Sequence, residues 1–192
     1  RGLAVSIDTH KPAVMRAALD AGAVMVNDVR ALRDEGALEV VAASTAAVCL
    51  MHLRGEPRTM QEAPEYADVL GEVKTFLAER AAVCEVAGIG RERIVIDPGF
   101  GFGKALDHNL ALLARLDEIV AQGYPVLAGL SRKSMLGALT GRGVGEREFA
   151  GIAAHLAAVA RGARLLRVHD VAAARDALAV WDAGEGNSSN DA

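Results

Sequence analysis

The chain has 192 residues, of which 52% are hydrophobic, and its formal net charge is −4. This length fits one domain with enough apolar content to bury a core. The weak negative charge argues against a nucleic acid or an anionic membrane surface as a partner, and no apolar run reaches the length of a membrane span. We therefore expect a protein that binds neither nucleic acid nor membranes.

The first half of the chain alternates apolar runs with helical spacing. Strands are predicted over 3–7, 24–26, 47–51 and 93–96, and helices over about 12–22, 37–44 and 66–87. The segment 53–64, which is rich in arginine and proline, is expected to form a mobile loop.

The second half continues the same alternation. Strands are predicted over 125–130 and 165–168, and helices over about 107–120, 134–139, 146–161 and 171–181. The small and polar tail over 184–192 is expected to be disordered, which leaves 1–183 as the folded domain.

This strict alternation predicts an α/β fold with a parallel, helix-covered sheet. Six strand–helix units do not close an eight-stranded barrel, which typically needs about 250 residues. The alternatives are an open sheet or a barrel that lacks two units before Arg1. Because the first predicted strand begins almost at residue 1, we expect a (β/α)8 TIM barrel truncated to about six βα units, its strands 3 to 8.

Polar residues stand directly after each of the six predicted strands. The carboxyl ends of parallel strands are where barrels and open α/β sheets build their sites. We therefore predict one shared site at that edge. The residues concerned are Asp8, Asn27, Asp28, His52, Asp97, the segment 131–134, His169 and Asp170.

The segment 97–104, DPGFGFGK, ends a predicted strand on an acid, a proline and glycines. It lacks the glycine and hydroxyl pattern of a phosphate-binding loop and also fails the dinucleotide fingerprint. Asp97 suits the N–C–N edge of a flat heterocycle, because a carboxylate accepts two parallel hydrogen bonds worth about 1.5–3 kcal/mol each. Asp8 and Asn27 end neighbouring strands and suit the rest of that edge. The alternative is an ordinary turn with a helix-capping Asp97.

The segment 131–134, SRKS, leads from a predicted strand into a helix. A helix N-terminus favours carboxylate or phosphate, although Ser131 and Ser134 are equally interpreted as ordinary helix caps. Lys133 opposes the helix dipole, which suggests a ligand oxygen or a carboxylate nearby.

Arg167 and His169 flank Val168 in the last predicted strand, so both fall on one face. An arginine and a histidine beyond a strand suit phosphate or pyrophosphate. The alternative is a surface salt bridge between this pair and Asp170. His52 is interpreted either as a ligand contact or as a core histidine.

Cysteine and histidine usage gives no pattern for a tight metal site. The chain has two cysteines, Cys49 and Cys84, and five histidines, none at metal-binding spacing. Free thiols fit a reducing compartment, so we expect a cytoplasmic protein. Any metal is expected to be Mg²⁺ bound through a substrate.

Several segments together resemble the dihydropteroate synthase family over residues 1 to about 182. The segments are SIDT at 6–9, VMVND at 24–28, CLMH at 49–52, IDPGFGFGK at 96–104, GLSRKS at 129–134 and RVHD at 167–170. RGEPRTMQ, at 54–61, resembles the bacterial form. The ordered set is specific, although no single piece is.

The resemblance implies a (β/α)8 barrel that joins para-aminobenzoate to a dihydropterin methyl pyrophosphate and releases pyrophosphate, with Mg²⁺ assisting. It also implies a homodimer. The implied pterin contacts are Asp8, Asn27, Met51, Asp97, Gly129 and Lys133. The implied pyrophosphate contacts are Arg167 and His169, and the implied para-aminobenzoate contacts are Phe102, Lys133 and Ser134.

One departure from the family pattern concerns its first two strand–helix units, whose loops contribute to the Mg²⁺–pyrophosphate site. They are absent before Arg1, so we expect turnover to require them. Two other interpretations stay open. One is the pterin-binding domain of a methyltetrahydrofolate methyltransferase, which SRKS and RVHD disfavour. The other is a non-catalytic, pterin-binding fragment.

Overall fold

The computed structural model describes residues 2–55 and 64–185. Outside those residues lie 186–192 of the tail expected to be disordered, most of the predicted mobile loop and most of the bacterial-type segment 54–61. Gly184, the first residue of the predicted tail, is helical, so the prediction is wrong at that position. Among the described residues, no helix is both long and apolar enough to cross a membrane.

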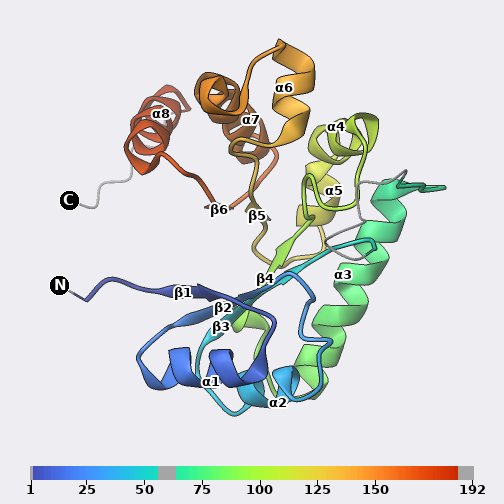
Figure 1. The fold of residues 1–192 in the computed structure, drawn as a ribbon, viewed down its shortest axis with the longest axis vertical. Coiled ribbons are helices and arrows are strands. Elements are labelled where there is room, and N and C mark those ends of the chain that lie inside the picture. The colour runs from blue at the N-terminus through green and yellow to red at the C-terminus, as the bar shows by residue number, and fades with distance from the viewer. Residues whose placement is uncertain (1, 56–63, 186–192) are drawn as a thin grey trace.

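Six parallel strands form the centre of the fold, in chain order (Figure 1). Strands β1 to β4 make one parallel sheet and β5 pairs with β6, while a parallel bridge from Ile96 to Val126 joins β4 to β5. The bounds are β1 Ser6–Asp8, β2 Met25–Asp28, β3 Ala47–Met51, β4 Ile94–Asp97, β5 Leu127–Ala128 and β6 Leu165–Leu166.

The helices lie outside the arc of strands, and each strand is followed by at least one helix (Figure 1). Their bounds are α1 Pro12–Asp20, α2 Ala37–Ala42, α3 Val69–Val86, α4 Leu106–Ala114, α5 Leu116–Val120, α6 Ser134–Thr140, α7 Glu148–Val159 and α8 Val171–Gly184. Short 3₁₀ turns cover η1 Arg91–Arg93 and η2 Val144–Glu146. The predicted α/β class, with six βα units of a barrel, is confirmed.

The outer strands are shorter than predicted, or shifted. β1 begins at Ser6 rather than residue 3. Before it, the Val5 carbonyl accepts from the Val24 amide, which precedes β2, but the residues there are exposed and form no regular strand. β5 and β6 have two residues each, although the Arg167 amide still donates to the Ala128 carbonyl. Apolar runs therefore overestimate strand length where strand pairing is sparse.

The helix predicted over 107–120 is two helices, because Arg115 leaves helical geometry with φ −118° and ψ 31°. α4 and α5 consequently bury different positions from those that one continuous helix would bury. Leu112, Leu116 and Ile119 are fully buried, whereas Leu110 is exposed.

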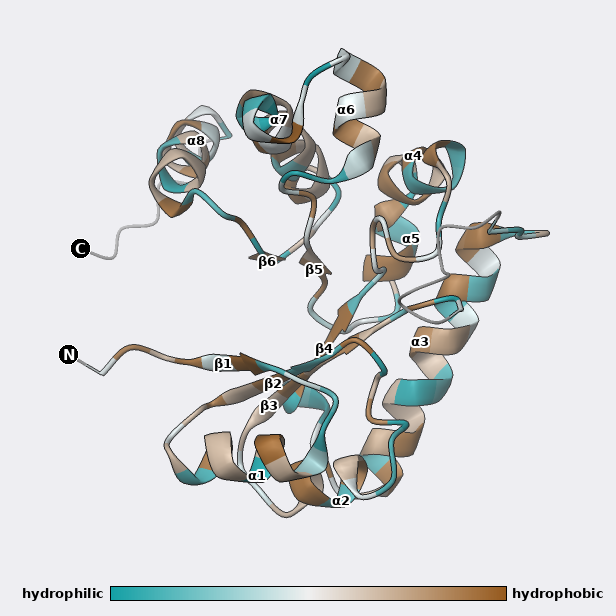
Figure 2. Cartoon of the chain, viewed as in Figure 1, coloured by the Kyte–Doolittle hydropathy of each residue, from teal (hydrophilic) through white to brown (hydrophobic). Residues whose placement is uncertain are grey.

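The core lies between the strands and the helices. β2 to β4 contribute buried aliphatic residues, and α3 packs one buried face against them, which includes Val73, Leu77 and Cys84. Apolar residues gather along the strands, whereas the helices carry patches of both kinds (Figure 2). Each fully buried aliphatic side chain contributes roughly 1.5–3 kcal/mol. The buried core holds the carboxyl ends of the strands in fixed relative positions.

Candidate functional site

The carboxyl ends of the strands surround a cavity of about 230 Å³, which we call the site cavity. It is lined by Asp8, Val29, Phe102, Gly129, Ser131, Lys133, Arg167, Val168 and His169. Seven of these are residues that the sequence assigned to a site, namely Asp8, Phe102, Gly129, Ser131, Lys133, Arg167 and His169. The predicted shared site at one edge of the sheet therefore corresponds to a real cavity.

Asp97 and Asn27 are absent from the lining of the site cavity, but both present acceptors to the guanidinium of Arg167, which lines it. Arg167 Nη2 donates to Asp97 Oδ2 at 2.8 Å, and Nη1 donates to Asn27 Oδ1 at 3.1 Å. Asp97 is 1% exposed, and its other oxygen accepts from the Gly99 amide at 2.7 Å. Asn27 Nδ2 in turn donates to Asp8 Oδ2 at 2.9 Å. One hydrogen-bonded row thus joins residues from four parts of the chain.

The alternative salt bridge between Arg167 and Asp170 is wrong for this structure. The Asp170 carboxylate accepts from the Ala173 amide at 3.0 Å and caps α8. Arg167 lies beyond the end of β6, so the alternation of side chains along a strand does not set the direction of its side chain. The ion pair with Asp97 sets that direction. A Cβ on Gly129 would lie 2.7 Å from Nη2 of this guanidinium, so Gly129 leaves room for the Arg167 side chain in its observed position.

Lys133 projects over the aromatic ring of Phe102. Its Nζ lies 3.9 Å from the ring centroid, which is a cation–π distance. Burial lowers the pKa of Lys133 to about 8, and the nearby carboxylate of Asp97 opposes that shift. Lys133 stands at the N-cap position of α6, as the sequence predicts.

Neither predicted serine cap is formed. Ser131 Oγ instead lies 2.8 Å from His169 Nδ1, and Ser134 is the exposed first residue of α6, outside the lining of the site cavity. The intervening Arg132 has φ +60°, an unusual backbone conformation for a residue with a side chain. This turn brings Ser131 and His169 together from two strand ends.

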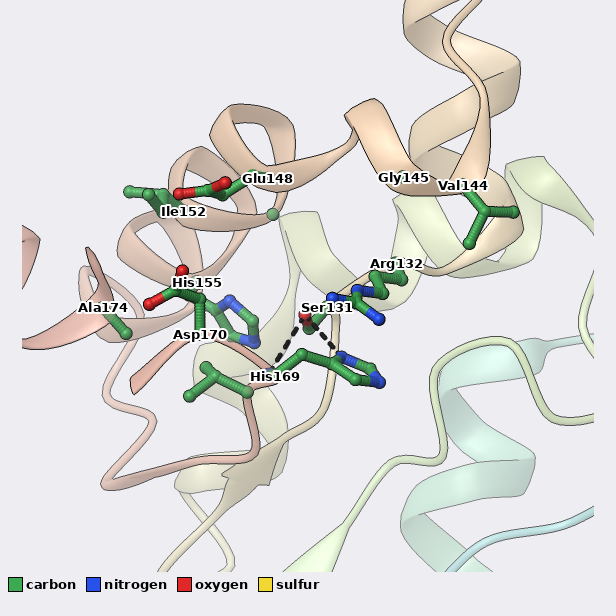
Figure 3. Close-up of a pocket in the computed structure, with 12 residues that line it drawn as sticks. Ser131, Arg132, Val144, Gly145, Glu148, Ile152, His155, His169, Asp170 and Ala174 are labelled. Carbon is green, nitrogen blue, oxygen red and sulfur yellow. Dashed lines mark hydrogen bonds between the residues drawn. The ribbon is translucent and has the colours of Figure 1, made fainter. Parts of the chain in front are cut away.

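A smaller pocket of about 70 Å³, the rear pocket, also includes Ser131 and His169 in its lining (Figure 3). Glu148, Ile152 and His155 of α7 lie on its helical side. The buried His155 Nε2 accepts from the Leu130 amide at 3.2 Å, and burial lowers the pKa of His155. His155 thus fixes the segment after β5, and its Nε2 is already occupied by this hydrogen bond.

His52 is a core histidine, which decides between its two interpretations. It is 6% exposed, and its Nδ1 lies 3.0 Å from Lys104 Nζ. Burial and then the charge of Lys104 lower its pKa to about 3, so His52 is neutral at physiological pH. The sequence did not single out Lys104, whose buried contacts depend on the folded loop.

Met51 is completely buried at the end of β3, in register with Asp97. Its side chain packs beside Gly99, and it is absent from the lining of the site cavity. Phe100 is likewise 1% exposed and belongs to the core, so Phe102 is the residue of this pair that lines the cavity.

The described residues contain no group of three or more His, Cys, Asp or Glu side chains that could hold a metal ion. Both cysteines are buried and free. The donor set of the described part of the chain therefore offers no protein cage for Mg²⁺, and a substrate-bound Mg²⁺ stays a prediction.

Comparison with known proteins gives consistent matches. The sequence pattern of a family described as "pterin binding enzyme" matches residues 2–169. Dihydropteroate synthase of Neisseria meningitidis serogroup B is 50% identical over 188 residues, which cover 95% of this chain and 66% of that protein. The chain therefore spans just under two thirds of the length of this relative.

Solved structures agree with the sequence matches. Dihydropteroate synthase from Stenotrophomonas maltophilia with active site-bound imidazole is 55% identical, with a TM-score of 0.93, over 95% of this chain and 69% of that chain. The Xanthomonas albilineans enzyme in complex with 7,8-dihydropteroate is 55% identical, with a TM-score of 0.89 and the same coverage. The similarity extends over almost the whole chain.

Proposed function

The chain belongs to the pterin-binding enzyme family, and we propose that it is the pterin-binding part of a dihydropteroate synthase of folate biosynthesis. The reaction condenses 6-hydroxymethyl-7,8-dihydropterin pyrophosphate with para-aminobenzoate and releases pyrophosphate. Dihydropteroate synthases about 50% identical to the chain support this choice, one of them in complex with 7,8-dihydropteroate.

The observation that carries the proposal is the guanidinium of Arg167 on Asp97 and Asn27. A guanidinium presents a flat N–C–N edge with N–H donors, and the pterin ring presents a similar edge. Acceptors that hold one such edge are placed to hold the other. Asp97 is almost completely buried, so its bonds to a ligand would be strong because water screens them little.

In the proposed complex, Asp97, Asn27 and Asp8 receive the donor edge of the pterin. Lys133 donates to a ring acceptor, and Gly129 leaves room for the flat ring. Met51 supports this region from inside the core, beside Gly99, rather than by lining the site cavity.

The pyrophosphate of the substrate is proposed to lie against Arg167 and His169. Both line the site cavity, and Arg167 exchanges its contact with Asp97 for the anion when the pterin edge arrives. These donors stabilise the charge that develops on the leaving group as the C–O bond breaks. Mg²⁺, carried by the pyrophosphate, would supply further neutralisation of that charge.

Para-aminobenzoate is proposed to bind beside Phe102, Lys133 and Ser134. Its ring packs against Phe102, and its carboxylate lies toward Ser134 at the start of α6. Its amine then attacks the cation-like methylene, which requires positioning rather than a nucleophilic side chain. Loss of an amine proton completes the new C–N bond.

The test is calorimetric binding of 6-hydroxymethyl-7,8-dihydropterin pyrophosphate to this chain, with and without Mg²⁺. We expect saturable binding by the natural chain and at least about tenfold weaker binding by Asp97→Asn, since a charge-assisted bond is worth about 1.5–3 kcal/mol. Asp107→Asn, an exposed change at the start of α4, is the matched control. Equal affinity in Asp97→Asn would remove Asp97 from the site.

Two broader properties belong to the same proposal. The family resemblance supports a cytoplasmic location and a homodimer, and sedimentation velocity would test the dimer. The methyltetrahydrofolate methyltransferase alternative predicts binding of methyltetrahydrofolate without para-aminobenzoate, so titrating both ligands separates the two functions.

A further inference from the structure

A buried lysine lies beside the proposed site and has no part in the proposed reaction. Lys104 is 3% exposed. Its Nζ donates to the carbonyls of Gly99 and Phe102, both at 3.0 Å, and lies 3.0 Å from His52 Nδ1. A longer contact of 3.5 Å joins Nζ to the His52 carbonyl oxygen. None of these four acceptors is a carboxylate, which is unusual for a buried ammonium.

The two carbonyls belong to the loop that carries the proposed ligand contacts. Within that loop, the Gly99 amide donates to Asp97, and the ring of Phe102 lies under the ammonium of Lys133. Gly99, Gly101 and Gly103 all have positive φ, so three residues of this short loop adopt a conformation that glycine favours. Ordering such residues costs about 1–2 kcal/mol each, and Lys104 supplies the bonds that oppose this.

The loop is held on both sides of Lys104. A Cβ on Gly99 would lie 2.0 Å from the His52 carbonyl oxygen, so the loop packs directly on the segment after β3. On the other side, Asn109 of α4 accepts from the Gly101 amide at 2.7 Å and donates to the Lys104 carbonyl at 3.0 Å. The ammonium therefore lies between two fixed backbone segments.

Burying the charged ammonium of Lys104 lowers the stability of the folded chain. Burial lowers the pKa of Lys104 to about 7, because the charged form loses water and receives only partial compensation from Asp97. Apolar side chains of similar size often replace buried charges with no loss of stability. The geometry that the ammonium imposes on the loop is the remaining benefit.

We propose that Lys104 is a positioning residue, whose ammonium fixes the loop of residues 99–102 so that Asp97 and Phe102 face the ligand. This inference rests on the proposed function. It assigns Lys104 an effect on affinity that passes through the loop, without contact between its side chain and the substrate.

The first test compares Lys104→Met with Lys104→Gln by calorimetric binding of 6-hydroxymethyl-7,8-dihydropterin pyrophosphate. Methionine fills the space without donating, so we expect at least a tenfold loss of affinity. Glutamine retains an N–H donor, so Lys104→Gln should bind more tightly than Lys104→Met and more weakly than the natural chain. Lys74→Met, on α3 and paired with Glu118, is the control that should bind like the natural chain. Natural affinity in a folded Lys104→Met protein would overturn the proposal.

A second measurement uses the natural chain and does not depend on a variant folding. Amide signals of Gly99, Gly101 and Phe102 are followed by ¹H–¹⁵N spectra from pH 6 to 9. We expect them to move together with a midpoint near the pKa of Lys104, about 7. The facing groups are His52, Asp97 and Lys133, and a Lys133→Met spectrum removes the facing lysine whose pKa, about 8, also lies in this range.

The two measurements separate this inference from the proposed function. Amide signals that stay fixed while the Lys104 Nζ signal titrates would overturn the positioning role. If the natural chain binds no pterin but the loop signals follow Lys104, the proposed function fails and the structural coupling stands.

Discussion

At the scale of single residues, Arg167 is the side chain with two possible partners. In the structure it pairs with Asp97 at 2.8 Å, and in the proposed complex it pairs with pyrophosphate. Asp97 Oδ1 is already engaged by the Gly99 amide, so a pterin edge competes with Arg167 for Oδ2. Pterin binding and release of Arg167 are thus expected to be coupled.

Arg167→Met should therefore act in opposite directions on two ligands. Affinity for 6-hydroxymethylpterin, which carries no anion, should stay equal or increase, because the competing guanidinium is gone. Affinity for its pyrophosphate ester should fall by at least about tenfold, because a charge-assisted pair to the anion is lost. Calorimetry with both ligands checks this.

A parallel loss of affinity for both ligands would contradict the exchange and indicate that Arg167 supports the pterin ring itself. Arg175→Met is a suitable control, because Arg175 lies on α8, lines a different pocket and is absent from the lining of the site cavity.

At the scale of elements, α3 packs one face into the core and buries six of its residues. Leu77 is completely buried on its inner face, and Val86 at its end is 90% exposed. Leu77→Ala should lower the free energy of unfolding by about 2–5 kcal/mol, because it removes buried surface and leaves a cavity. Urea denaturation at pH 7.5 measures the change.

Val86→Ala is the matched control in the same helix and should change the free energy of unfolding by less than about 0.5 kcal/mol. A loss in Leu77→Ala as small as that of the control would mean that α3 is not packed on the strands as described.

Element boundaries also show where local patterns succeed. β3 has the predicted bounds, 47–51, because it is buried between two partners and its apolar run equals its paired length. β6 ends two residues before the predicted strand 165–168 does, because its pairing with β5 is short. Strand propensity reports burial, whereas the strand end depends on the neighbouring strand.

At the scale of the whole molecule, the buried ammonium of Lys104 makes stability depend on pH. Its folded pKa of about 7 lies below the ordinary value near 10.4, so between these values the unfolded chain binds more protons than the folded chain. The free energy of unfolding therefore rises with pH in this window. Below about pH 7, where Lys104 is charged in the folded chain, the buried charge lowers the free energy of unfolding.

Between pH 7 and 8.5 we expect the free energy of unfolding to increase by on the order of 1 kcal/mol. The window stops there because burial raises the pKa of Cys84 to about 11, which makes stability fall once the unfolded thiol ionises. Urea denaturation across this range should show the rise in the natural chain and a smaller one in Lys104→Met. An unchanged slope in that variant would assign the effect to another group.

Local sequence patterns are sufficient to predict the alternation of strands and helices, the parallel α/β class and the polar residues at the strand ends. These follow from local periodicity, since an apolar strand must stop at a polar or turn residue. They also place Asp97, Lys133, Arg167 and His169 at one edge, because all parallel strands end on the same side.

Which of these side chains contact one another follows from the folded arrangement of the elements. Arg167 pairs with Asp97 across 70 positions, and Lys104 meets His52 across 52. In the folded chain Met51 is buried in the core and does not line the site cavity, and Ser131 is hydrogen-bonded to His169. Local sequence patterns carry no information on such pairs, because a hydrogen bond requires atoms within a few tenths of an ångström, and the packing of distant elements sets those distances.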